Sequence, residues 1–417
     1  MNLALSDEQV LLREAAREAL SRVDSLQQAR SALDHGPRED LWPIAKDAGW
    51  PGLLIGEEQG GAGLGAFDAM LVLGECGRRL AQVPLLGHLP ASAILIADGR
   101  CDEWLAGLAG GQLRAAYLPA SPPTDIDERW SLDPMRGWER APLPVAHLDA
   151  RDGDLSGSGD LRRSAAERGS DERRQAAPKD GGSETVDGGE TVIVNGTFAF
   201  VPDAPGADLL VGVATLANRP VGVAIDADSS SIHIEAADSY DGARSLGHVT
   251  LRDTKARLLQ TEQEALADAW HLAQALIAAE SIGAVEAALE ISVAYAKERH
   301  TFGRPIGSYQ AVKHSLTEVL RQLENGRSLL YYAGWSREGA PEQFPLAANA
   351  ARCVAGRALE YASRTMIAVH GGIGATWEHD APLYFRRAQL TRRLLGGTRL
   401  ATDRVAGQML AQARAAP

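Results

Sequence analysis

Residues 295–310 hold the densest set of side chains that could do chemistry, and they read YAKERHTFGRPIGSYQ. Arg299 carries a permanent charge, and its planar guanidinium suits bidentate contact with a diphosphate. Thr301 and Gln310 add a hydroxyl and an amide, and Phe302 adds an aromatic ring beside a tight Gly/Pro turn. A lone arginine at a helix end could simply interact with the terminal carbonyls of that helix. Because all four side chains occur together, the stretch predicts a site for a phosphate-bearing cofactor.

A second candidate lies at residues 369–380, which read VHGGIGATWEHD. Gly371 and Gly372 have no Cβ, so their backbone amides could approach a phosphate or a ring closely. Four neighbouring side chains are potential metal ligands: His370, Glu378, His379 and Asp380. Their spacing matches no standard ligand set, so no metal site is predicted. The acidic pair also suits the first turn of a helix.

A glycine-rich loop at residues 56–65, GEEQGGAGLG, could be mistaken for a phosphate loop. It lacks the Lys-Ser/Thr of a P-loop, and no strongly β-branched strand precedes it. We therefore interpret it as a turn between helices.

The elements that would position these residues are helical at both ends of the chain. Ser6 is a good N-cap for a first helix that continues to Leu20. Apolar spacing predicts further helices over residues 41–48, 66–82 and 90–109, and then over 272–297, 309–335, 342–370, 379–394 and 398–414. The long C-terminal helices have apolar faces, which predicts a four-helix bundle.

The middle of the chain has the pattern of an all-β unit. Short β-branched or apolar runs recur between turn residues, at 115–118, 191–194, 209–215, 221–225, 231–235 and 249–251. Residues 151–190 are rich in Arg, Asp, Glu, Gly and Ser, so they predict a flexible insertion at a hairpin. The predicted organisation is α+β with three domains: an N-terminal α-helical domain over 1–112, a central β-barrel or sandwich over 113–255, and the helical bundle over 256–417.

Composition excludes several classes of protein. The chain has 417 residues and a net charge of −13, which argues against a general nucleic-acid role. It has three isolated cysteines and no C-x-x-C pair, as expected of reduced thiols in a cytoplasmic protein. We find no apolar stretch of the roughly 18 residues that a membrane span needs, and no signal-peptide pattern at the N-terminus.

Residues 295–310 resemble the signature of the acyl-CoA dehydrogenase family, flavoenzymes that desaturate acyl-CoA thioesters. Three other segments continue the resemblance. The 56–65 loop is similar to a Pro-Glu-Glu-x-Gly-Gly-x-Gly loop, with Gly56 in the place of proline. Residues 371–378 resemble a Gly-Gly-x-Gly segment that ends in Glu, although Ala368 stands where glutamine is usual. Residues 384–388, YFRRA, resemble its Arg-Asp-Ala segment.

The resemblance implies the α-β-α architecture of this family and an FAD cofactor. It implies that Arg299, Thr301, Phe302 and Gln310 reach across a subunit interface and hold the adenosine diphosphate half of a neighbour's FAD. Gly371, Gly372 and Thr398 are expected to add contacts to it. The expected assembly is a homo- or hetero-oligomer, dimer or tetramer. Its expected substrate is an acyl-CoA from fatty acid or sterol side-chain β-oxidation, and its expected electron acceptor is an electron-transfer flavoprotein.

Desaturation needs a carboxylate that removes the α-proton in a dry site. The family places this glutamate in one of two positions, which correspond here to Gly396 and Ala273. Neither residue can accept a proton. Glu280 is the nearest acid on the helix of Ala273, roughly 10 Å further along. It is therefore the candidate base, and the alternative is a carboxylate paired with an arginine of a neighbouring helix or subunit.

The central region departs from the family pattern where flavin and substrate contacts are expected. Residues 118–124, LPASPPT, match the Thr-Glu-Pro segment poorly. Residues 195–202, NGTFAFVP, resemble Asn-Gly-x-Lys-x-Trp-Ile-Thr, so Phe200 could supply the aromatic wall. Pro202 replaces the threonine and removes both a hydroxyl and a backbone donor.

Three functional hypotheses follow. The chain could be a self-sufficient FAD-dependent acyl-CoA dehydrogenase with a relocated base. It could instead be a non-catalytic partner that completes the FAD site of a catalytic relative. A flavin-dependent monooxygenase or oxidase on the same fold is a third possibility, and no residue in the sequence is special to it.

Overall fold

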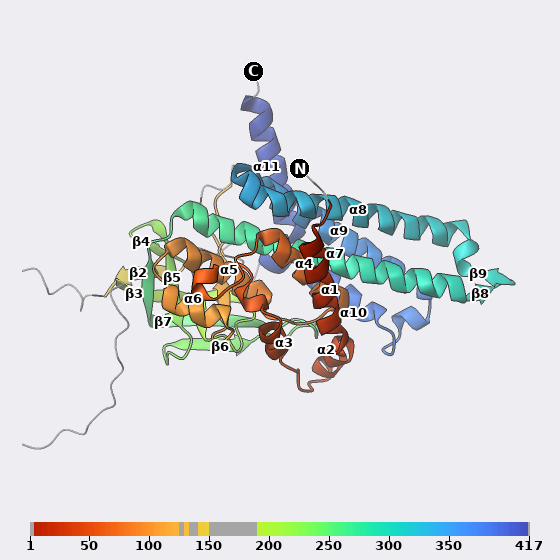
Figure 1. The fold of residues 1–417 in the computed structure, drawn as a ribbon, viewed down its shortest axis with the longest axis horizontal. Helices are drawn as coiled ribbons and strands as arrows, with labels where there is room; N and C mark the ends of the chain where they lie inside the picture. The colour runs from red at the N-terminus through yellow and green to blue at the C-terminus, as the bar shows by residue number, and fades with distance from the viewer. Residues whose placement is uncertain (1–3, 125–128, 133–140, 150–189, 416–417) are drawn as a thin grey trace, which may run out of the picture.

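The computed structural model describes residues 4–124, 129–132, 141–149 and 190–415 (Figure 1). The predicted insertion at 151–190 therefore lies almost wholly outside the described residues. The described chain contains an N-terminal set of helices, a sheet and a C-terminal bundle, in the predicted order.

Six helices form the N-terminal part: α1 Asp7–Ser21, α2 Ser25–Leu33, α3 Trp42–Asp47, α4 Ala66–Arg79, α5 Leu85–Asp98 and α6 Asp102–Ala109. The Ser6 cap is confirmed, because its side chain accepts from the Gln9 amide in a capping box. One expectation was wrong. The helix predicted over 90–109 is two helices, since the chain turns at Gly99 with φ of 68°. The helix α2 was not predicted.

Seven strands of the described residues form one sheet, and a separate two-stranded hairpin lies in the C-terminal part. They are β1 Ala115–Leu118, β2 Val145–Leu148, β3 Thr191–Pro202, β4 Leu209–Leu216, β5 Arg219–Asp226, β6 Ile232–Ala236 and β7 Leu246–Leu259. The order is β1-β4-β2-β3-β7-β5, and β5 also pairs with β4, so five strands close a ring. The strand β7 continues beyond residue 255, where the predicted β domain ended.

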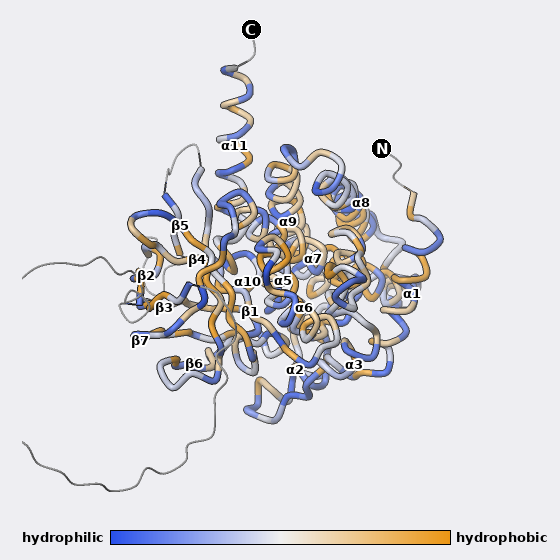
Figure 2. Tube along the Cα trace, turned by 60° about the vertical axis from the view of Figure 1, so that its left-hand side comes forward, coloured by the Kyte–Doolittle hydropathy of each residue, from blue (hydrophilic) through white to orange (hydrophobic). Residues whose placement is uncertain are grey.

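Five helices form the C-terminal part: α7 Gln263–Glu298, α8 Gln310–Gly339, α9 Phe344–His370, α10 Ala381–Thr391 and α11 Gly397–Ala415. Apolar residues concentrate in the interior where α7, α9 and α5 pack (Figure 2). The last turns of α11 project from the body and expose Met409 and Leu410, each 58% accessible (Figures 1 and 2).

Glycines bring α4 and α7 into backbone contact. A Cβ added to Gly283 would lie 1.8 Å from the Gly74 carbonyl oxygen, and one added to Gly77 would lie 1.9 Å from the Glu280 carbonyl oxygen. Only glycine permits such an approach, because any side chain would force the two helices apart. The N-terminal helices are therefore packed tightly on the long helix that carries Glu280 and ends beside Arg299.

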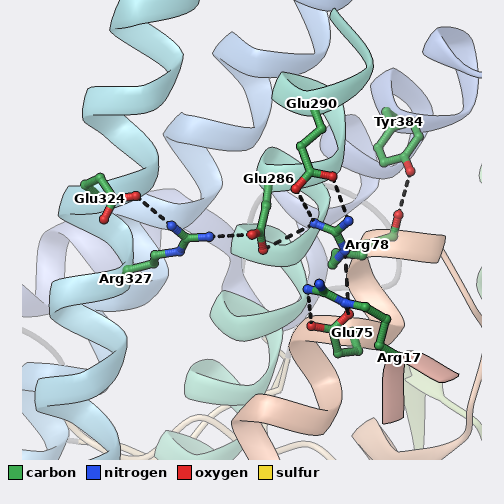
Figure 3. A network of polar contacts seen from close by, with 8 residues as sticks. All are labelled: Arg17, Glu75, Arg78, Glu286, Glu290, Glu324, Arg327 and Tyr384. Carbon is green, nitrogen blue, oxygen red and sulfur yellow. Dashed lines mark hydrogen bonds and ion pairs between the residues drawn. The ribbon is translucent and has the colours of Figure 1, made fainter. Parts of the chain in front are cut away.

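A polar network ties the same helices together beside this crossing (Figure 3). Arg78 of α4 contacts two carboxylates of α7, Glu290 at 2.7 Å and Glu286 at 3.5 Å. Arg327 of α8 reaches Glu286 at 2.6 Å. The Tyr384 hydroxyl of α10 donates to the Arg78 carbonyl oxygen at 2.6 Å. Three helices, α4, α8 and α10, thus hold α7 in one position, which fixes the side chains further along it.

Candidate functional site

The chain turns sharply at the end of α7. Arg299 caps that helix, and the hairpin β8 His300–Thr301 and β9 Arg304–Pro305 follows, before α8 begins at Gln310. The hairpin tip is Phe302-Gly303, and both residues have positive φ, of 49° and 79°. A two-residue turn of this kind matches the twist of paired strands.

Local bonds hold this corner rigid. The Ile306 amide donates to the Arg299 carbonyl oxygen at 2.7 Å. The Tyr309 hydroxyl donates to the Thr301 carbonyl oxygen at 3.0 Å, and the Arg304 guanidinium lies 4.1 Å from the centre of the Tyr309 ring. These contacts involve backbone groups and the side chains of Arg304 and Tyr309. The side chains of Arg299 and Thr301 remain exposed to solvent.

The four cofactor contacts predicted within residues 299–310 are all exposed at this corner. Phe302 is 94% accessible, and Arg299, Thr301 and Gln310 are exposed as well. No hydrogen bond or ion pair joins the side chains of these three polar residues to any other part of the chain that the structure describes. Gln310 is also the first residue of the 30-residue helix α8, where the helix dipole favours an anion. The corner therefore presents hydrogen-bond donors and an aromatic ring to solvent.

The second predicted segment lies at the same end of the bundle (Figure 1). The ring of Tyr295, one turn before Arg299, lies 4.3 Å from the ring of His370, the last residue of α9. Gly371 follows with φ of 63°, and a Cβ on Gly371 or Gly372 would meet nothing within 4 Å. The Gly371 amide already donates to the Ile367 carbonyl oxygen at 3.0 Å, so what the turn offers a phosphate or ring is open space for close backbone approach. The fold thus brings together the two segments that the sequence singled out.

The two positions where a catalytic glutamate was sought converge elsewhere in the fold. The side-chain amide of Gln274, next to Ala273, donates to the carbonyl oxygen of Leu395, next to Gly396, at 3.1 Å. One place in this fold therefore corresponds to both positions, and neither residue there carries a carboxylate. Nearby on α7, burial lowers the pKa of the His271 imidazole to about 3, so that ring remains neutral at physiological pH.

Glu280 lies in a buried ion pair. Its carboxylate accepts from the guanidinium of Arg244, in the segment between β6 and β7, and the two side chains are only 6% and 5% accessible. A second buried pair is adjacent: Arg387 of α10 contacts Asp241 at 2.7 Å. Arg244 and Arg387 therefore bring two positive charges into this buried region. Glu280 and Asp241 supply the two opposite charges.

The side of the fold expected to face a flavin ring contains a bulge and an acid. The β3–β7 register shifts between Phe198 and Val201, and Phe200 lies inside this irregularity with φ of 52°. Its ring is 39% accessible and meets the His248 ring edge-on at 4.7 Å. Asp203 follows the strand, is buried, and accepts from the Gly87 amide at 3.0 Å. Burial raises the pKa of Asp203 to about 6.

Thr398 differs from the other predicted contacts because its hydroxyl points inward. The oxygen is buried and makes no hydrogen bond within the described residues. A Cβ added to Gly356 of α9 would lie 2.6 Å from it. The hydroxyl therefore faces the bundle, away from the exposed corner at Arg299.

Several side chains that shape this region could not be found from sequence spacing. Asp203, Asp241 and Arg244 lie in loops with no pattern of their own, and only the fold brings them to α5, α10 and α7 respectively. The one available signal was Glu280 on an apolar helix face, because a buried acid requires a partner. Among the described residues, no group of three or more His, Cys, Asp or Glu could hold a metal ion. No described helix is both long and apolar enough to cross a bilayer.

Two family models match the chain. The acyl-CoA dehydrogenase N-terminal domain matches residues 6–111, and the acyl-CoA dehydrogenase C-terminal domain matches residues 266–410. Together they cover more than half of the chain, and the strand-rich middle lies between them.

Whole-chain relatives agree with these matches. Acyl-CoA dehydrogenase IpdE2 of Mycolicibacterium smegmatis is 27% identical over 398 residues, which cover 95% of this chain and 96% of the relative. A variant of the Tcur3481-Tcur3483 steroid ACAD has a TM-score of 0.78 and 25% identity, covering 98% of this chain and 99% of that one. The ChsE4-ChsE5 complex from Mycobacterium tuberculosis has a TM-score of 0.76 at 22% identity, covering 99% of both chains, which shows the shared fold.

Proposed function

The chain belongs to the acyl-CoA dehydrogenase family of oxidoreductases, and we propose from this that it is a subunit of an FAD-dependent enzyme that desaturates an acyl-CoA thioester. The FAD site lies at a subunit interface, and this chain contributes Arg299, Thr301, Phe302 and Gln310 to it. The observation that carries the proposal is the rigid corner at the end of α7, whose donors point to solvent.

The chemistry of this corner suits the adenosine diphosphate half of FAD. Arg299 can form two charge-assisted hydrogen bonds to phosphate oxygens, and Thr301 and Gln310 can donate to the remaining polar edges. Gly371 and Gly372 leave room for close backbone approach. When bound, FAD accepts the β-hydride of the acyl-CoA. The residues of this chain bind and orient its distal half.

The exposed apolar groups support an interface at these surfaces. A 94% accessible phenylalanine at a hairpin tip is costly in water, and it would be covered if Phe302 inserted into a neighbouring chain. Met409 and Leu410 at the projecting end of α11 provide a second apolar contact. We propose an assembly of two or four chains, with an electron-transfer flavoprotein as the electron acceptor. A steroid-derived acyl-CoA is the proposed substrate class, by analogy with the Tcur3481-Tcur3483 steroid ACAD.

A second candidate function is that of a partner subunit without a catalytic base. The observation in its favour is that Ala273 and Gly396 converge without a carboxylate, while Glu280 is neutralised by Arg244. In this arrangement the catalytic glutamate and most of the flavin-ring site belong to a related chain. This chain completes the diphosphate site of that relative, and the FAD-binding corner has the same role in both candidates.

Co-expression tests both candidates. The chain is purified alone, and also together with a paralogue that carries glutamate at the position of Gly396, and acyl-CoA turnover is followed with an artificial electron acceptor. Turnover by either preparation, lost on Arg299→Ala in this chain, supports the proposed function. Turnover that requires the paralogue supports the partner role. Flavin content and turnover that are unchanged by Arg299→Ala would contradict the proposed function.

A further inference from the structure

Two neighbouring residues of α7, Trp270 and His271, carry buried N–H donors that find no acceptor in the described part of the chain. Trp270 is 2% accessible, and its indole Nε1 is buried without a hydrogen bond to any described residue. His271 is 5% accessible. A buried donor without a partner is rare in folded proteins, because it has lost its bonds to water and gained none in exchange. Two such donors in succession point to an acceptor from outside the chain.

The hydrogen bonds of Asn349 define which nitrogen of His271 is the donor. The Asn349 Nδ2 group donates to the Pro345 carbonyl oxygen at 2.6 Å, and it lies 3.2 Å from His271 Nδ1. An amide nitrogen can only donate, so Nδ1 accepts and the ring carries its proton on Nε2. Burial lowers the pKa of His271 to about 3, so the ring keeps this neutral form. Among the described residues, none accepts a hydrogen bond from Nε2.

The charged residue that acts on the His271 ring is itself a donor. Arg404 of α11 adds to the lowering of the pKa of His271. Its guanidinium donates to the Ser121 hydroxyl at 2.9 Å and to the carbonyl oxygens of Pro122 and Pro123. A guanidinium has no lone pair to offer, so Arg404 cannot satisfy the His271 N–H.

Both donors lie on the face of α7 that reaches the place expected for the catalytic carboxylate. Successive residues of an α-helix are about 100° apart, so Trp270 and Gln274 share one face. His271 and Ala273 flank that pair. The Gln274 amide donates to the Leu395 carbonyl oxygen at 3.1 Å, in the turn that contains the other base position. In an acyl-CoA dehydrogenase that carboxylate acts on the acyl group, so the two donors lie beside the place where the acyl group would bind.

We propose that Trp270 and His271 are specificity-determining residues that bind a ketone oxygen on the acyl group of the substrate. A ketone oxygen has two lone pairs and no proton, so it matches two uncharged donors. An acyl group without oxygen leaves both N–H groups buried and unpaired, and the site therefore discriminates against it. This inference rests on the proposed function, because it names the substrate class of the same site.

Calorimetric binding of cyclohexanecarboxyl-CoA and of its 3-oxo and 4-oxo derivatives tests the inference, with the chain alone and with the co-expressed assembly. Wild type should bind at least one oxo derivative about tenfold more tightly than the parent thioester, the scale of one buried hydrogen bond. Trp270→Phe and His271→Phe keep an aromatic ring but remove the donor, so each should reduce this preference while affinity for the parent changes little. Trp335→Phe and His314→Phe, at exposed positions of α8, are the matched controls and should retain it.

Equal wild-type affinities for the three thioesters, or a preference that either variant leaves unchanged, would overturn the inference and assign the donors to a buried water. If no preparation binds a CoA thioester, the proposed function fails. The Trp270 indole N–H resonance of the chain, identified by its loss in Trp270→Phe, then decides the inference. A shift of this resonance with free cyclohexanone that is absent with cyclohexane supports the site. No shift, or an equal shift with cyclohexane, overturns it.

Discussion

Replacement of Glu280 by glutamine distinguishes two roles for this residue, that of a catalytic base and that of a buried counter-charge to Arg244. Glu280→Gln preserves size but removes the charge opposite Arg244, whose side chain is 5% accessible. Leaving one partner of a buried ion pair uncompensated costs about 3–5 kcal/mol of unfolding free energy. For a cooperative unit of this size, that corresponds to a fall in Tm of roughly 3–6 °C.

The assay is thermal unfolding followed by tryptophan fluorescence, combined with turnover. Glu290→Gln is the matched control on the same helix: its side chain is 55% accessible, and its partner Arg78 also contacts Glu75 and Glu286. The control should cost less than about 1 kcal/mol. The double variant Glu280→Met with Arg244→Met should recover most of the lost Tm, since a buried pair replaced by apolar groups is often neutral.

A base role for Glu280 predicts a different pattern. Glu280→Gln would then abolish turnover of the chain purified alone while Tm stays at the wild-type value. That result would refute the reasoning from burial and pairing.

The same structure leads to three further predictions. Arg299→Ala should lower the FAD affinity of the assembly about 10- to 150-fold, the value of a charge-assisted hydrogen bond, without shifting Tm. A shift in Tm with unchanged flavin binding would contradict a cofactor-binding role for this exposed side chain. Asp203→Asn should raise Tm at pH 7.5, because burial raises the pKa of Asp203 to about 6 and ionisation of this buried carboxyl opposes folding. The gain should shrink toward pH 5, and the pKa shift from 3.8 limits it to about 3 kcal/mol. A loss of Tm at pH 7.5 would contradict this prediction. Gly283→Ala should lower Tm by several degrees, because its Cβ would meet the Gly74 carbonyl oxygen at 1.8 Å. Gly303→Ala, at the open hairpin tip, should perturb only the FAD-binding corner. Equal Tm values for the two variants would show that α4 and α7 can separate freely.

The exposed corner was predictable because all of its information is local. Arg299 ends a helix without proline, Gly303 and Pro305 fix a turn, and Gln310 starts the next helix, so spacing alone places the donors. The helices of the bundle were predictable for the same reason, since their apolar periodicity extends over many turns. Gly99, which splits the predicted 90–109 helix, shows the limit of this approach: a single residue at positive φ outweighs favourable helical neighbours.

The buried part of the candidate site depends on contacts between distant segments. Glu280 meets Arg244 across 36 positions, and Arg387 meets Asp241 across 146, so no spacing rule joins them. Both arginines come from segments that read as ordinary loop or helix. The sequence indicated that Glu280 needed either a substrate or a cation. Three-dimensional packing supplies the cation, and it comes from the β region rather than from a helix.

We propose that this chain contributes Arg299 and its neighbours to an FAD site shared across a subunit interface. The most direct measurement is the number of FAD molecules per chain, from flavin absorbance, for the chain alone and for its co-purified assembly, each with and without Arg299→Ala. We predict that FAD is retained only in an oligomer and is lost when Arg299 is replaced. FAD that remains bound to a monomer, or to an assembly carrying Arg299→Ala, would contradict it.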